Sequence, residues 1–157
     1  MILPMSFQPA QQLRVVIVLP VPLSIELDAD EVAEVERTRV LRIALLEAGY
    51  NVVATLPGDR FLPDRLSQIQ PDMIVVDAES QGRDILEHVV MATRDERRPI
   101  VMFSDDDDTS YVRKAIAAGV SAYVAAGTPA EHIKPVIDVA MARFEHEEKL
   151  RGELADA

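Results

Sequence analysis

The sequence has no cysteine, and aromatic residues make up only 4% of its 157 residues. The absence of cysteine excludes disulfide bonds, thiol catalysis and thiolate metal sites, and it agrees with a cytoplasmic location. Because 48% of the residues are nevertheless hydrophobic, the core must be built from valine, isoleucine, leucine, alanine and methionine. A chain of this length predicts one domain around a single core.

Positive charge is also scarce, because 16 lysine and arginine residues face 27 acidic residues and leave a formal net charge of −11. Such a surface repels phosphate backbones, so we expect no nucleic-acid binding by this chain alone. No apolar run is long enough to cross a bilayer, and the opening MILPMSFQPAQQ lacks the cationic start and apolar core of a signal peptide. We therefore expect residues 1–12 to form a flexible leader on a cytoplasmic protein without membrane contact.

Several catalytic motifs are missing as well. The sequence contains no glycine-rich phosphate loop, no GxSxG elbow and no HExxH motif. His88, His132 and His146 are isolated from one another on predicted helices. Because no nucleophile and base can be paired, we expect a non-enzymatic protein with no catalytic residue and no resident metal.

What the chain does contain is a regular alternation of apolar, strand-like runs with helical periodicity. Strands are predicted at 13–19, 51–56, 72–77, 99–104 and 120–124. Helices are predicted from about 30 to 48 and from 62 to 68. Three more are marked by apolar residues: Leu86, Val89 and Val90; then Val112, Ala115 and Ile116, closed by Gly119; and finally Ile133, Ile137, Ala140, Met141 and Phe144, in a long helix that continues to about residue 154. Right-handed crossovers then give an α/β fold with a doubly wound, five-stranded parallel sheet in the order 2-1-3-4-5.

Two of these strands end in side chains suited to phosphoryl chemistry. The run MIVV ends in Asp77, and PIVMF ends in Ser104. The carboxyl ends of parallel strands meet at one edge of the sheet, so this carboxylate and this hydroxyl are expected to be neighbours. Asp77 is thus a candidate nucleophile for an acyl phosphate, a reaction that needs a divalent cation. The alternative is that Asp77 only caps the following turn.

The ligands for such a cation are missing from the expected place. Directly after the first strand the chain has Leu19, Pro20, Val21 and Pro22, which cannot bind a cation. The acids Glu26, Asp28 and Asp30 lie farther along the same loop. We therefore expect no metal site and no cofactor, with Mg²⁺ required only if Asp77 is active.

Two charged clusters are interpreted as surface features. The run Asp105–Asp108 lacks the glycine turn and distal glutamate of a calcium loop, and it suits the N-terminal end of the next helix better. The patch of Arg94, Arg97 and Arg98 is interrupted by two acids, so we expect a solvated turn.

Taken together, six stretches of the chain resemble the receiver domains of two-component response regulators. The resemblance is nearest to the NasT/AmiR-type antiterminator receivers of the ANTAR family, and it covers about residues 13–148. The stretches are LRIALLEAGYNVV, QPDMIVVDAES, GRDILEHVV, RPIVMFSDDDD, AGVSAYVAAG and VIDVAMARFE. These antiterminators continue into an RNA-binding helical bundle, whereas this sequence ends at Ala157; a stand-alone receiver and a chain cut before its output domain both fit.

The resemblance implies roles for particular residues. It matches Asp77 to the phosphoacceptor, Ser104 to the switch hydroxyl and Tyr123 to the switch aromatic residue. The position of the usual lysine falls on Ala126, which removes a cationic partner of the phosphoryl oxygens. The expected function is an atypical receiver, or pseudo-receiver, that signals through contact with a protein such as a sensor or kinase. The alternative is a phosphorylation-competent receiver that accepts the phosphoryl group on Asp77.

The last helix is longer than the sheet can cover. We expect a receiver-like domain at 13–145 and a helical extension at 146–157, and the resemblance implies that this helix leads into a dimerising coiled coil. A weak homodimer is predicted because Leu150 and Leu154 follow the core stripe at i, i+4 spacing. Glu147 and Arg151 occupy core-like heptad places, so a strong coiled coil is not expected. The predicted interaction surface comprises Ile137, Met141, Phe144, Leu150 and Leu154.

Overall fold

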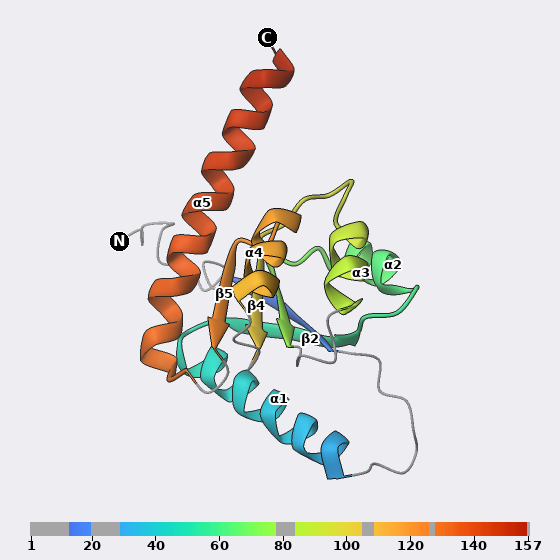
Figure 1. The fold of residues 1–157 in the computed structure, drawn as a ribbon, viewed down its shortest axis with the longest axis vertical. Coiled ribbons are helices and arrows are strands. Elements are labelled where there is room, and N and C mark those ends of the chain that lie inside the picture. Colours follow the sequence, from blue (N-terminus) through green and yellow to red (C-terminus); the bar gives the residue numbers. More distant parts are fainter. Residues whose placement is uncertain (1–12, 20–28, 78–83, 105–108, 126–127, 157) are drawn as a thin grey trace, which may run out of the picture.

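The computed structural model of the protein describes residues 13–19, 29–77, 84–104, 109–125 and 128–156 (Figure 1). Five strands alternate with five helices along these residues. The strands are β1 (Arg14–Leu19), β2 (Asn51–Pro57), β3 (Met73–Asp77), β4 (Ile100–Ser104) and β5 (Ala122–Ala125). The helices are α1 (Ala29–Glu47), α2 (Leu62–Ile69), α3 (Asp84–Ala92), α4 (Thr109–Ala118) and α5 (Ala130–Asp156).

All strand pairs are parallel, and the sheet order is β2-β1-β3-β4-β5. The predicted fold class and strand order are therefore confirmed. The central strands are apolar on both faces because helices cover both sides of the sheet. Val15 and Ile17 of β1 contribute to one core and Val16 and Val18 to the other, and all four side chains are fully buried.

The two cores assign each helix to one face of the sheet. Leu41 and Leu45 of α1 pack with Ile133 and Ile137 of α5 on the first face. The second face is covered by α2, α3 and α4, which lie together on the side of the sheet away from α5 (Figure 1). Both faces are thus closed by aliphatic packing, as expected from the scarcity of aromatic residues.

The last strand begins two residues later than its sequence pattern predicts. The amide of Val120 donates to the carbonyl of Ala115 at 3.1 Å and so belongs to the turn that ends α4. Gly119 stands in that turn with φ +119°, a conformation that glycine adopts without steric cost. The apolar Val120 is buried, but its backbone is used to end the helix rather than to extend the sheet.

Helix α5 is the longest element, with 27 residues, and it projects well past the sheet (Figure 1). It includes residues 146–156 of the predicted extension without interruption. Within the described part of the chain, no helix combines the length and the apolar character that crossing a membrane would need.

Candidate functional site

Asp77 lies at the carboxyl end of β3, and its carboxylate accepts a hydrogen bond from a hydroxyl group of helix α1. The Oγ1 atom of Thr38, in α1, donates a hydrogen bond to Oδ2 of Asp77 at 2.6 Å. Thr38 is buried, with 6% of its surface exposed, and Asp77 is half-buried. Short hydrogen bonds to an ionised acceptor are among the stronger ones in proteins. An uncharged donor therefore holds one oxygen of the candidate phosphoacceptor.

The position of Thr38 follows from the buried stripe of α1. Thr38, Leu41 and Leu45 have i, i+3, i+7 spacing, and all three side chains are buried. A buried hydroxyl requires a hydrogen-bond partner, and the end of β3 supplies one. The sequence analysis did not identify Thr38 as a site residue. The available signal was a polar side chain at a helix position where the stripe calls for an apolar one.

Ser104 lies beside Asp77 at the same edge of the sheet. In the ladder between β3 and β4, Asp77 pairs with Phe103, and Ser104 is the next residue of β4. The Ser104 side chain is buried, with 2% exposed. The structure thus brings together the strand-end carboxylate and the strand-end hydroxyl, as the sequence pattern predicts.

Tyr123 points to the face of the sheet that α4 covers. Its ring packs edge-on against the ring of Tyr111, with the centroids 6.4 Å apart and the planes at 80°. The hydroxyl of Tyr111 donates in turn to the sulfur of Met102 at 3.7 Å. Tyr111 is buried and Tyr123 half-buried, so the aromatic pair fills the space between α4 and the sheet.

No group of three or more acidic or histidine side chains among the described residues could hold a metal ion. The acids Glu26, Asp28 and Asp105–Asp108 and the lysine-replacing Ala126 lie outside the described residues, as does the side chain of Asp30. What the sequence predicts for these positions stays a prediction.

The predicted interaction surface on α5 divides into buried and exposed parts. Ile137 is fully buried in the core beneath α5, so it is not available to a partner and we remove it from that surface. Met141 and Phe144 are half-buried. Leu150 and Leu154, with 46% and 77% of their surfaces exposed, lie beyond the sheet.

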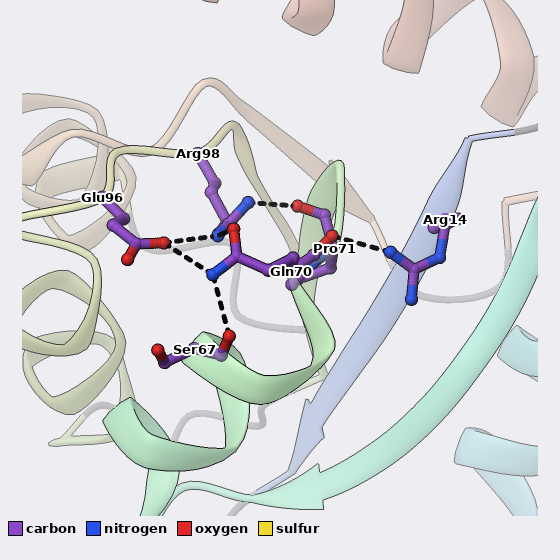
Figure 2. A network of polar contacts seen from close by, with 6 residues as sticks. All are labelled: Arg14, Ser67, Gln70, Pro71, Glu96 and Arg98. Atoms are coloured by element: carbon purple, nitrogen blue, oxygen red, sulfur yellow. Dashed lines mark hydrogen bonds and ion pairs between the residues drawn. The ribbon is translucent and has the colours of Figure 1, made fainter.

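The opposite, amino-terminal edge of the sheet carries a polar network around Gln70 (Figure 2). Gln70 ends α2 with φ +54°, and its carbonyl accepts a hydrogen bond from the Arg14 guanidinium at 2.8 Å. Its side-chain amide donates to Glu96 at 2.9 Å and accepts from Arg98 at 3.0 Å. Arg98 also pairs with Glu96 at 2.9 Å and donates to the carbonyl of Pro71.

This network changes the interpretation of the turn at 94–98. The Arg98 side chain is only 14% exposed, so the expectation of a fully solvated turn is wrong for this residue. Its guanidinium has a planar fork of donors, which lets it satisfy several acceptors from different segments at once. The residue ties the start of β4 to the end of α2.

With the geometry of both edges known, comparison with other proteins is informative. No family model matches the sequence. The transcriptional regulatory protein PdtaR of Mycobacterium tuberculosis is 28% identical over 112 residues, which are 71% of this chain and 54% of PdtaR. The chain thus spans about half the length of the curated relatives it matches.

Solved structures share the arrangement over most of the chain. The signal receiver domain of a modulated diguanylate cyclase from Desulfovibrio desulfuricans has a TM-score of 0.61 and 18% identity, over 87% of this chain and 99% of that domain. A two-component response regulator of the LuxR family from Aurantimonas has a TM-score of 0.58 and 22% identity, over 84% of this chain and 86% of that structure. This chain has the receiver fold.

Within the receiver fold, Asp77, Ser104 and Tyr123 occupy the ends of β3 and β4 and the middle of β5. These are the strands to which the sequence resemblance assigned the phosphoacceptor, the switch hydroxyl and the switch aromatic residue. Similarities at 18–22% identity concern the fold, so the nearer resemblance to NasT/AmiR-type antiterminators stays a prediction.

Proposed function

We propose that this chain is an atypical receiver module that signals through contact with a protein partner, and that Asp77 accepts phosphoryl groups poorly. The partner class is a sensor or kinase of a two-component-type pathway, and the module serves transcriptional regulation. The similarity to PdtaR, a transcriptional regulatory protein, supports this assignment. The hydrogen bond between Thr38 and Asp77 is the observation that carries the proposal.

The Thr38 hydroxyl is a poor substitute for a cation. An acyl phosphate at Asp77 would replace the single negative charge of its carboxylate by a phosphoryl group with about two negative charges. Receivers that react readily need a divalent ion there to neutralise the phosphoryl oxygens. A threonine hydroxyl offers one proton and no net charge, and it holds Oδ2 of Asp77 at 2.6 Å.

The chain following β1 supports the same conclusion. Leu19 ends β1, and Pro20, Val21 and Pro22 come next in the sequence, where paired acids are needed to bind the ion. None of these side chains carries a carboxylate. Without the acids and without a lysine at Ala126, phosphorylation would place like charges together with little compensation.

A competent receiver is the second candidate function, and one observation favours it. Asp77 and Ser104 lie on neighbouring strands at one edge, which is the arrangement that lets a hydroxyl contact a phosphoryl group on the aspartate. The acids at 26, 28 and 30 would then have to supply the missing ligands for Mg²⁺.

Labelling with a small acyl phosphate separates the two functions. The purified chain is incubated with the phosphodonor and Mg²⁺, and its intact mass is followed over time. We expect little stable phosphorylated product, and no signal above that of the D77N control. Ready labelling that D77N abolishes would refute the proposal and establish the competent receiver. A magnesium titration of the same two proteins gives an independent reading, since only a competent site binds the ion near Asp77.

The proposed route of output is α5. Leu150 and Leu154 are exposed beyond the part of the helix that the sheet covers, and such a helix is more stable when paired. A weak homodimer through this segment is therefore part of the proposal, together with the contact to a sensor or kinase. The proposed location is the cytoplasm.

A further inference from the structure

The amino-terminal edge of the receiver fold has a pocket that the signalling role does not use. It lies between the end of α3, the start of β4 and the end of α4, with a volume of about 140 Å³. Val90, Ile100 and Ala118 contribute apolar surface, and Arg94, Arg97 and Arg98 contribute the charged groups. None of the described residues that line the pocket is acidic.

The turn at 94–98 separates its charges between two sides. Asp95 and Glu96 line a different pocket, on the α2 side of the turn. Glu96 is engaged there by Arg98 and Gln70, at 2.9 Å each. Asp95 and Glu96 thus do not line the pocket that holds Arg94 and Arg97, and the Glu96 carboxylate is paired with Arg98. A cationic pocket results in a chain whose formal net charge is −11.

Two of the arginines have capacity for a ligand. Arg94 is exposed, and its side chain makes no hydrogen bond or ion pair with any residue that the structure describes, whereas its backbone amide donates to the carbonyl of Met91 at 3.3 Å. Arg97 is bound only at the surface, where its Nε donates to Oε1 of Glu148 at 2.7 Å. Surface ion pairs of this kind are weak and exchange readily for another anion.

From these observations we infer that the pocket binds a small phosphate-bearing anion between Arg94 and Arg97. Guanidinium groups match the oxygens of phosphate with paired hydrogen bonds, and two of them suit a tetrahedral dianion better than a planar carboxylate. A cavity of this size accepts a ligand of about six heavy atoms, which is enough for one phosphate group and little more. The site is remote from Asp77, at the opposite edge of the sheet, and it does not depend on whether Asp77 is phosphorylated.

The inferred anion would compete with Glu148 for Arg97. Glu148 belongs to the part of α5 that extends past the sheet, and its ion pair with Arg97 attaches this part of the helix to the domain. An anion that binds Arg97 in the pocket would therefore weaken this attachment. By linkage, weakening the Arg97–Glu148 pair must strengthen anion binding.

Calorimetric titration of the full chain with inorganic phosphate, at constant ionic strength set by chloride, tests the inference. We expect saturable binding that R94Q and R97Q each weaken by a factor of about ten. R113Q, which removes an exposed arginine of α4 outside the pocket, and D77N are expected to leave the affinity unchanged. E148Q is expected to strengthen it by about threefold. A parallel titration with methyl phosphate, a monoester small enough for the cavity, distinguishes a monoester ligand from free phosphate by which one binds more tightly.

The competing explanation is that the arginines only neutralise the carbonyl ends of α3 and α4. In that case R94Q lowers the thermal stability of the chain, and phosphate gives no saturable heat at constant ionic strength. Binding that R94Q and R97Q leave unchanged would likewise overturn the inference. Circular dichroism of each variant confirms that the fold is intact before the titrations are compared.

Discussion

Replacing Thr38 by valine removes one donor from the Asp77 site and keeps the shape of the side chain. A hydrogen bond to a charged acceptor contributes about 1.5–3 kcal/mol. Asp77 is half-buried and retains other interactions, so we expect a loss near the lower limit, about 1.5 kcal/mol in the free energy of unfolding. For a chain of this size the melting temperature then falls by about 3–6 °C.

Urea unfolding followed by circular dichroism measures this loss, and T93V is the matched control. Thr93 is as buried as Thr38, at 6%, but its hydroxyl donates to the backbone carbonyl of Val89 at 3.0 Å, a neutral acceptor. T93V should therefore cost less than T38V. A double-mutant cycle of T38V with D77A isolates the pair, and we expect a coupling energy of about 1 kcal/mol. If T38V costs no more than T93V, or if the two effects in the cycle simply add, the Thr38–Asp77 bond does not hold the site.

Two further predictions concern other parts of the chain. The hydroxyl of Tyr50 is buried without a hydrogen-bond partner among the described residues, so Y50F should raise the free energy of unfolding at pH 7 by about 1 kcal/mol. Burial raises the pKa of Tyr50 to about 12, above its ordinary 10.0. The free energy of unfolding of the wild type should therefore fall as the pH rises from 10 to 12, and Y50F should lack this contribution to the fall. If the free energy of unfolding, measured with urea, changes equally in both proteins between pH 7 and pH 11, this prediction is wrong. Replacing Leu150 and Leu154 by serine should abolish any increase of the molar mass with concentration in light scattering, whereas V139S, at another exposed site of α5, should not. If the parent chain is monomeric at all concentrations, the dimer hypothesis is wrong.

The sheet could be predicted from the sequence because its information is local. Apolar runs of strand length mark the central strands, and Gly49 and Gly119 mark the ends of α1 and α4 by permitting positive φ angles of +97° and +119°. The chirality rule then fixes the strand order. The error at the start of the last strand arose because Val120 is apolar and buried, yet its amide closes the preceding helix.

The polar contacts could not be predicted in the same way, because they join residues far apart in the chain. Thr38 and Asp77 are 39 positions apart, and Gln70 meets Arg14 across 56. No sequence periodicity indicates such pairs, because they depend on how α1 and the end of α2 pack against the sheet. The charge separation at 94–98 is of this type too, since alternating signs in sequence say nothing about which side of the turn each group occupies.

The ion pair between Arg97 and Glu148 attaches α5 to the domain part-way along its projecting segment, and so determines how much of the helix is free to move. From Ala140, the last fully buried residue of the helix, to Asp156 the axis is about 24 Å long. A tilt of about 5° about the buried part would move the tip by roughly 2 Å. When the ion pair holds Glu148 in place, only the segment from Glu148 to Asp156, about 12 Å long, can tilt, and the displacement of the tip is halved. One contact between two partly exposed side chains therefore determines how far a small rotation inside the domain moves the end of α5.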